Sequence, residues 1–384
     1  MISFGKLTRM IAEIIPEVER FRRRLHRIPE IAGKEFQTGA AIRQVLAPLN
    51  LEIAEPFLQT DVIAVLNRGK THNLTFRADM DALPIEEAAV DCPYRSTHSG
   101  MMHACGHDGH MAMLYGAAKI LSELRDEIPC SIRFLFQPGE EMACMAKALL
   151  ASGALRDPEP DFITGLHIWP GEPYGKICTR PGVLMAAAGF FRIVLHGKGG
   201  HGSLPEAAGN PIDCAAEIIT GCRSIVPDGC VLTFCACHAG QSNIVIPETT
   251  ELKGTIRFLD VAQGERLKAE FENRVREIAH RRGIDCDFRC PTPYLPVVNR
   301  PEFYGAVKKI LTEAGGSDSF YELPRHTMSS EDFSWYLQRY PGIFCHLGAG
   351  SSAPLHSPQF DFDDKLLPVG ICYFCLLALH GGRL

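Results

Sequence analysis

The sequence predicts an α/β protein: a discontinuous α/β domain that receives an inserted α+β domain. Strand-like and helix-like segments alternate through the first half of the chain, which is typical of a sheet covered by helices. Four strands and two helices follow in the order β-α-β-β-α-β, which is the ferredoxin-like arrangement. The chain has 384 residues. Because one hydrophobic core stops growing at about 250–300 residues, two domains are expected.

The first part of the chain supplies most elements of the α/β domain. Residues 7–27 have helical spacing of apolar side chains and a basic end at Arg22, and Pro16 marks either a start or a kink. Asp108 stands where an N-cap would begin a later helix. Further helices are expected at residues 38–47, 109–124 and up to 150, and strands at 61–66, 74–78, 131–136 and 162–167.

The pattern changes near residue 186. The segment that follows is compact, with strands expected at residues 189–195, 230–236, 251–259 and 284–289 and helices at 211–222 and 262–281. The earlier pattern then resumes with helices at 300–314, 332–337 and 366–380 and a strand at 343–347. We therefore expect a first domain of residues 1–184 and 293–384 and an inserted domain of residues 185–292.

Composition excludes several classes of protein. The net charge is −6 and no long basic run occurs, so neither nucleic acid nor an anionic membrane surface is an expected partner. No apolar run approaches the about 20 residues of a membrane span, and the charged N-terminal segment reads as a helix rather than a signal peptide. Fifteen cysteines at irregular spacing argue against a disulfide framework and favour a reducing cytoplasm.

Residues 101–110 (MMHACGHDGH) concentrate side chains that bind metals. Gly106 separates Cys105 from His107, so a tight turn can direct both side chains to one point. Thiolate and neutral imidazole are ligands that zinc and its first-row neighbours prefer. A buried loop with ordinary core histidines has the same pattern, so the interpretation depends on further ligands elsewhere.

Other candidate ligands lie at or just past the ends of strand-like runs, and the carboxyl ends of strands form the ligand crevice of an open α/β sheet. These residues are Asp79, Asp81, Glu140, Glu141 and His167. His356, in a loop near the C-terminus, is a further candidate. Together with residues 101–110 they suffice for two metal ions about 3.5–4 Å apart.

Seven motifs carry a resemblance to a known family. They are FRADMDALP (76–84), HACGHDGH (103–110), FQPGEE (136–141), GLHIW (165–169), GGHGSLP (199–205), SSEDF (329–333) and PLHSPQFDFDD (354–364). In these motifs the chain resembles the amidohydrolase branch of the M20 metallopeptidases, which includes N-acyl-amino-acid amidohydrolases, hippurate hydrolases and auxin-conjugate hydrolases. The resemblance implies metal-dependent hydrolysis of the amide bond of N-acyl-L-amino acids.

Two alternatives to this activity stay open. Within the family, the enzyme could be a dipeptidase or a carboxypeptidase. A non-catalytic metal-binding or regulatory protein is the alternative from another class. Glu140 counts against it, because binding alone does not require an extra acid beside a complete ligand set.

The resemblance also implies a role for each matching residue. The metal ligands would be Cys105, His107, Glu141, His167 and His356. Glu140 matches the general base, and Asp81 matches a carboxylate that orients a metal-binding histidine. Two divalent ions are implied, and Zn, Mn, Co and Ni all accept such ligands. Asp79 could hold its loop by backbone hydrogen bonds, and we expect a structural role for His110.

The inserted domain contributes three further matches. His201 matches a histidine that reaches the active site of a partner subunit and helps to stabilise an oxyanion, so a homodimer is implied. Asn243 and Arg257 match positions that hold a small substrate. Arg257 could pair with a carboxylate through two hydrogen bonds, although a strand arginine that faces solvent fits its position equally well.

Overall fold

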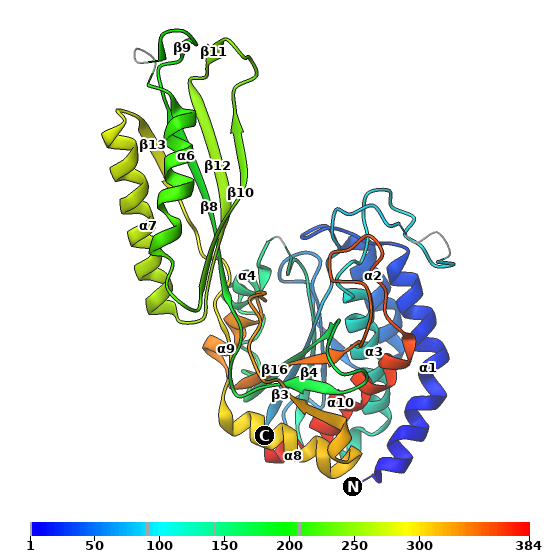
Figure 1. Ribbon diagram of the computed structural model, residues 1–384. Coiled ribbons are helices and arrows are strands. Elements are labelled where there is room, and N and C mark those ends of the chain that lie inside the picture. Colours follow the sequence, from blue (N-terminus) through cyan, green and yellow to red (C-terminus); the bar gives the residue numbers. More distant parts are fainter. Residues whose placement is uncertain (1, 89–91, 142, 206–208) are drawn as a thin grey trace. The chain divides into compact units, whose positions relative to one another are not determined.

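The computed structural model describes residues 2–88, 92–141, 143–205 and 209–384, and the chain forms two compact units (Figure 1). The first unit comprises Met1–Leu184, Val298–Arg325 and Asp332–Leu384, and the second Met185–Val297 and His326–Glu331. The sequence did not predict that residues 326–331 belong to the second unit. They do so because the Ala186 N–H donates to the carbonyls of Thr327 at 3.1 Å and Ser329 at 2.9 Å.

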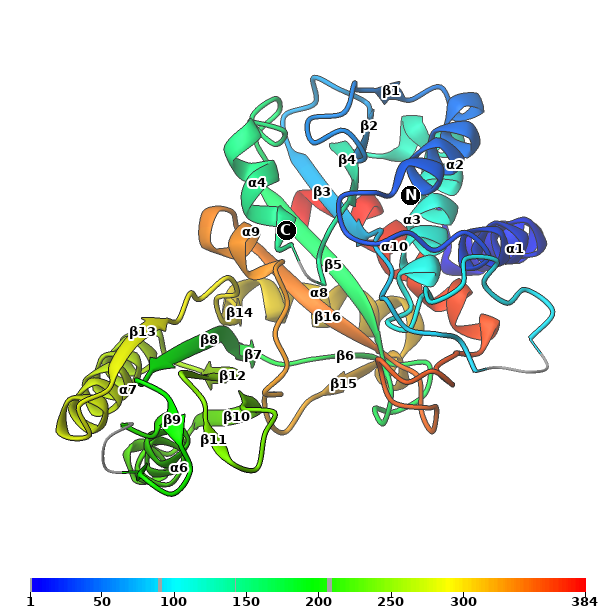
Figure 2. The ribbon, with the colours of Figure 1, turned by 90° about the horizontal axis from the view of Figure 1, so that it is seen from above.

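A mixed sheet of eight strands runs through the first unit (Figure 2). In spatial order the strands are β1 (Glu52–Ile53), β2 (Val62–Leu66), β4 (Ser131–Gln137), β3 (Asn73–Asp79), β5 (Phe162–Trp169), β16 (Gly342–Gly348), β6 (Ile177–Thr179) and β15 (Phe320–Glu322). Strands β4, β3, β5 and β16 are parallel, so their carboxyl ends share one edge. Strands β7 (Gly182–Met185) and β14 (Val297–Asn299) lie where the chain passes between the units.

Helices cover both faces of this sheet (Figure 2). One face carries α1 (Phe4–His26), α2 (Phe36–Leu46), α3 (His107–Glu123), α8 (Pro301–Gly315) and α10 (Leu367–Leu379), and the other carries α4 (Met145–Ser152) and α9 (Ser334–Arg339). Strand β4 is buried at every residue, as expected of a strand with helices on both sides. None of the helices in the described ranges has the length and apolar character that a membrane crossing needs.

The structure excludes one of the two options for Pro16, and the prediction of Asp108 as an N-cap is wrong. Pro16 lies inside α1, whose N-cap is Ser3, so this proline does not begin the helix. The N-cap of α3 is Gly106, which adopts the left-handed φ of 81° that glycine tolerates. Asp108 lies in the first turn of α3 instead, where its carboxylate is bound by Arg22 and His26.

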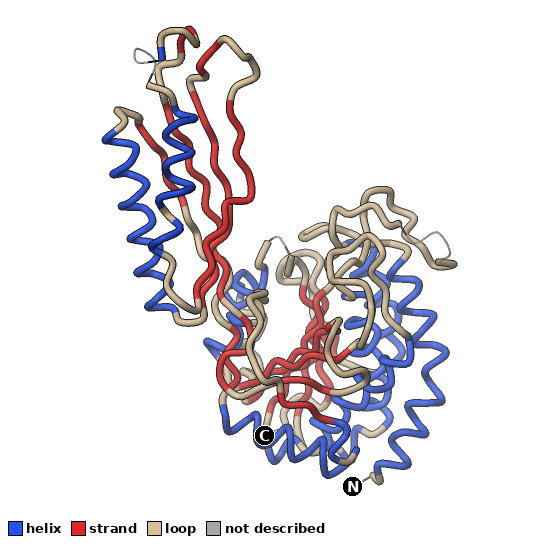
Figure 3. The backbone as a smooth tube through the Cα atoms, in the orientation of Figure 1, coloured by secondary structure: helices blue, strands red, loops and turns tan. Residues whose placement is uncertain are grey.

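The second unit has the predicted β-α-β-β-α-β order, with both helices on one face of an antiparallel sheet (Figures 1 and 3). The elements are β8 (Ala187–His196), α6 (Pro211–Gly221), β10 (Cys230–Ala239), β12 (Thr249–Phe258), α7 (Val261–Arg281) and β13 (Asp285–Arg289), and the strand order is β10-β12-β8-β13. Two short strands that the sequence did not predict, β9 (Gly200–His201) and β11 (Val245–Ile246), pair with each other.

Candidate metal centre

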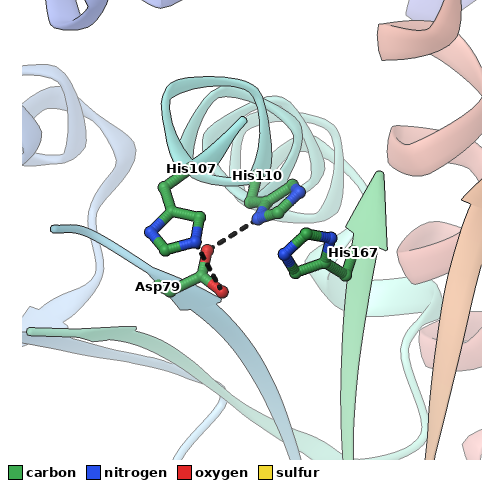
Figure 4. A group of neighbouring side chains, drawn as sticks. All are labelled: Asp79, His107, His110 and His167. Atoms are coloured by element: carbon green, nitrogen blue, oxygen red, sulfur yellow. Dashed lines mark hydrogen bonds and ion pairs between the residues drawn. The ribbon is translucent and has the colours of Figure 1, made fainter. Parts of the chain in front are cut away.

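Polar side chains gather at the edge where the parallel strands of the first unit end. Asp79 is the last residue of β3, His167 lies near the end of β5, and His107 begins α3. Figure 4 shows that His107 and His110 of α3 and His167 of β5 lie around Asp79. The predicted grouping of strand ends at one edge is therefore present.

The structure brings the five predicted metal ligands into one contiguous group. Cys105 Sγ lies 3.4 Å from His167 Nε2, and His107 Nε2 lies 3.8 Å from Glu141 Oε1. Glu141 Oε1 is 3.1 Å from His356 Nε2. One ligand atom from each of Cys105, His107 and Glu141 lies within 4.8 Å of the others. Thiolate, imidazole and carboxylate donors together fit divalent first-row metal ions.

The environment of His107 fits a bound cation. This side chain is buried, and neither ring nitrogen makes a hydrogen bond within the described residues. Nδ1 lies 3.4 Å from Asp81 Oδ1, and Nε2 lies 3.7 Å from Asp79 Oδ2. Burial opposes protonation, but the negative charges of Asp79 and Asp81 raise the pKa of His107 to about 10. The surplus of carboxylates at this point therefore favours positive charge, which a metal ion supplies.

His167 and Cys105 are prepared for a metal in different ways. His167 Nδ1 donates to the carbonyl of Ile168 at 2.7 Å, which leaves the Nε2 lone pair facing Cys105. Burial, together with the neighbouring His110, holds the pKa of His167 well below its usual value, so the ring is neutral. Burial and the charge of Glu141 raise the pKa of the Cys105 thiol, so a metal ion is required to make it a thiolate.

His110 has the structural role that we expected. Its Nε2 accepts the Ile168 N–H at 2.9 Å, and its Nδ1 donates to Asp79 Oδ1 at 2.6 Å. Both ring nitrogens are therefore occupied, and the ring ties α3 to β3 and β5. The expectation for Asp79 is not met among the described residues: its carboxylate contacts side chains there, including Arg77 Nη1 at 2.7 Å, and no backbone N–H group.

Asp81 organises the turn that carries the two glutamates. Its Oδ1 accepts the Glu140 N–H and its Oδ2 the Glu141 N–H, both at 2.9 Å, while Oδ1 also faces His107. Glu140 is buried, and its Oε1 accepts the Asp332 N–H at 3.2 Å. The sequence reading gave Asp332 no role, although it stands in the SSEDF motif.

His356 reaches the site from a loop with an unusual backbone conformation. Its φ is 64°, which is uncommon for a residue other than glycine. The His356 N–H donates to the carbonyl of Ala104 at 2.8 Å, which fixes the loop beside the Cys105 segment. Burial opposes ionisation of Glu141, but the hydrogen bond from His356 and the charge of His107 hold the pKa of this carboxyl below its usual value.

The other three predicted site residues lie in the second unit. His201 is exposed on β9, and its Nδ1 accepts the Ser203 hydroxyl at 2.7 Å, which leaves Nε2 available. Asn243 is exposed in the loop before β11. Arg257 on β12 is partly buried and donates to Ser330 Oγ at 2.7 Å, with no carboxylate partner among the described residues. Burial lowers the pKa of Arg257.

The chain is similar to known proteins along most of its length. Residues 75–380 match a model of the peptidase family M20/M25/M40. N-acetylcysteine deacetylase of Bacillus subtilis is 36% identical over 93% of this chain and 95% of its own length. Thermostable carboxypeptidase 2 of Saccharolobus solfataricus is 35% identical over 97% of this chain and 98% of its own length.

A solved structure extends the likeness to the fold. The Bacillus subtilis YXEP protein, a dinuclear metal-binding peptidase, has a TM-score of 0.83 and 31% identity, and the match covers 96% of this chain and 99% of that one. Sequence and structure thus match along nearly the whole chain. The protein belongs to peptidase family M20.

Proposed function

We propose that the protein is a metal-dependent amidohydrolase that cleaves N-acyl-L-amino acids to a carboxylic acid and a free amino acid. The observation that carries this proposal is the convergence of five candidate ligands beside a buried acid, Glu140, on a turn that Asp81 holds. The proposed ligands are Cys105, His107, Glu141, His167 and His356, and the proposed ions are two of Zn, Mn, Co or Ni.

Each acid of the turn has a separate task. Divalent ions at this site would lower the pKa of a water molecule and polarise the amide carbonyl. Glu141 contacts His107 and His356, whereas the Glu140 carboxylate accepts the Asp332 N–H. Glu140 would take the proton of the attacking water and deliver it to the departing nitrogen. Asp81 would hold His107 and the turn in fixed positions relative to each other.

We propose that three residues of the second unit contact substrate. Arg257 has no carboxylate partner among the described residues, so the α-carboxylate of an amino acid can pair with it. Asn243 would contribute an amide, and His201 would stabilise the oxyanion through its available Nε2. The deacetylase among the relatives supports an N-acyl amino acid as substrate. The carboxypeptidase among them supports peptide cleavage as the second candidate.

We further propose a cytoplasmic homodimer in which His201 acts in the partner's site. The turn that carries His201 also presents exposed apolar side chains: Leu204 is 64% exposed and Ile244 is 66% exposed. Such side chains fit an interface better than open solvent. All fifteen cysteines are free thiols, in keeping with a reducing compartment. Sedimentation equilibrium at the assay concentration tests the dimer, and an active monomer would contradict it.

Matched substrates and one substitution test the activity. The enzyme is loaded with Mn, Zn, Co or Ni and given N-acetyl and N-benzoyl amino acids, the same amides without the α-carboxylate, and dipeptides. We expect cleavage of the N-acyl amino acids and poor cleavage of the truncated amides. If only dipeptides are cleaved, the second candidate replaces the first; metal uptake without any hydrolysis would favour a binding protein.

Glu140→Gln separates catalysis from metal binding. Glutamine keeps an acceptor for the Asp332 N–H but cannot take a proton. We expect kcat to fall by about 10²–10⁴-fold with the metal content unchanged. An unaltered kcat would remove Glu140 from the role of general base.

A further inference from the structure

A buried carboxyl group with no part in the proposed chemistry lies behind the turn that carries Glu140. Glu35 is 0% exposed and stands at the N-cap of α2. Its Oε1 accepts the N–H of Gly33 at 2.9 Å and the N–H of Gly139 at 3.0 Å. Its Oε2 accepts the Thr60 hydroxyl at 2.9 Å. Three segments that are distant in sequence therefore meet at one side chain.

The turn at residues 139–141 offers three consecutive backbone N–H groups to two carboxylates. Gly139 donates to Glu35, whereas Glu140 and Glu141 donate to the two oxygens of Asp81 at 2.9 Å each. Gly139 has a φ of 64°, so the chain reverses here after leaving β4. Glu35 thus fixes the first residue of the turn, and Asp81 fixes the two acids.

The support behind Glu35 is itself tied to the segment that carries Asp81. The Ala82 N–H donates to the carbonyl of Glu30 at 2.8 Å. The Glu30 carboxylate in turn accepts the Thr38 N–H at 2.9 Å, at the start of α2. The two carboxylates that hold the turn are therefore part of one hydrogen-bonded frame.

The hydrogen bond to Gly139 does not depend on the charge of Glu35. Burial raises the pKa of Glu35 to about 7, and the charge of Asp81 acts in the same direction. A protonated carboxyl keeps a carbonyl oxygen that can accept both N–H groups. Glutamine has the same oxygen and can donate to Thr60 Oγ1, so it is a matched replacement, whereas alanine leaves the Gly139 N–H buried without a partner.

We propose that Glu35 is a positioning residue, which holds Gly139 so that the Glu140 carboxylate is aligned for proton transfer. This inference rests on the proposed function, because Glu35 affects the reaction only if Glu140 is the general base. Glu141 has His107 and His356 beside its carboxylate. Release of Gly139 should therefore affect proton transfer more than metal binding.

Three substitutions in the full-length, metal-loaded protein test this role. E35A removes the acceptor, E35D keeps the carboxyl group but withdraws it from Gly139, and E35Q keeps the acceptor at its original reach. For each we would measure kcat and KM on an N-acyl amino acid that the wild type cleaves, the metal content, and amide hydrogen exchange in the peptide 137–141. We expect E35A and E35D to lower kcat by about 10²-fold, with KM and metal content nearly unchanged and with faster exchange.

E35Q should keep both kcat and the rate of amide hydrogen exchange near the wild-type values. If E35A does not fold, the contrast between E35D and E35Q decides the question. The inference is overturned if E35D keeps the wild-type kcat, if E35Q is impaired as much as E35D, or if the loss of kcat follows a loss of metal. Hydrogen exchange needs no substrate, so it judges the bond to Gly139 even if the wild type cleaves no N-acyl amino acid.

Discussion

Arg77 offers a test of how much the buried charge network beside the candidate metal centre stabilises the fold. Its side chain is 1% exposed. Nη1 lies 2.7 Å from Asp79 Oδ2, Nη2 lies 3.0 Å from Asp332 Oδ1, and Nε donates to Gln137 Oε1 at 2.9 Å. The guanidinium therefore neutralises one carboxylate next to His107 and another whose backbone supports Glu140. Arg77→Met would keep the apolar stem and remove the charge.

The expected cost follows from what each carboxylate retains. Asp332 would keep the Gln137 amide at 2.8 Å and the Ala146 N–H at 2.9 Å. Asp79 would keep His110 Nδ1 at 2.6 Å. Neither is stripped of donors, so we expect the loss for one broken buried pair, about 3–5 kcal/mol, rather than twice that. This is a large part of the about 5–15 kcal/mol by which proteins are stable.

Urea unfolding in the presence of a chelator measures this loss without a contribution from bound metal. The control is Arg68→Met. Arg68 Nε lies 2.6 Å from Glu52 Oε2, with the side chains 36% and 60% exposed, so its loss should cost about 0.2–1 kcal/mol. If Arg77→Met costs no more than this control, the buried charge network is not a source of stability. The double variant with Asp332→Asn should be less destabilised than the sum of the single variants, by about 0.5–3 kcal/mol.

Two further predictions concern the metal and the dependence on pH. Cys105→Ala should lower the metal content found by elemental analysis, and an unchanged content would remove Cys105 from the ligand set. Burial opposes protonation of His26, but the hydrogen bond to Asp108 and its charge raise the pKa from 6.5 to about 9. The contribution of His26 to the free energy of unfolding is therefore fully present below its pKa in the unfolded chain. This contribution, about 3 kcal/mol, is lost as the pH rises through the pKa in the folded protein. Urea unfolding at about pH 6 and about pH 10 should show a loss of unfolding free energy that is about 3 kcal/mol larger in the wild type than in His26→Gln. An equal loss in the two proteins would contradict the role of His26.

The elements that surround the site could be predicted because their signals are local. The ends of β3, β4 and β5 follow long buried runs, and the candidate ligands stand directly after them or inside them. Parallel strands then bring these ends together without any further information. Strands of two or three residues, such as β9 and β15, have too few positions to show a period, so the sequence did not reveal them.

The parts that escaped prediction depend on partners that are distant in sequence. Arg22 reads as a basic residue at a helix end, yet it is buried and pairs with Asp108, Asp361 and Asp364. Asp108 was predicted to be an N-cap because nothing in its own segment reveals that Arg22 is its partner. Glu35 stands in an ordinary polar stretch, and only the fold places it against Gly139. Local patterns thus reveal candidate ligands better than they reveal the distant groups that hold those ligands in place.

The occupied ring of His110 has a consequence for how the protein would take up metal. Because that ring already joins α3 to the ends of β3 and β5, the ligand frame does not have to assemble around an ion. If a divalent ion binds here, loading would chiefly exchange cations, because His107 and the Cys105 thiol would each give up a proton to become ligands. Uptake would acidify a weakly buffered solution, and affinity would weaken in acid while the scaffold stays in place. The affinity for metal would then be set by the protonation of the ligands rather than by folding around the ion.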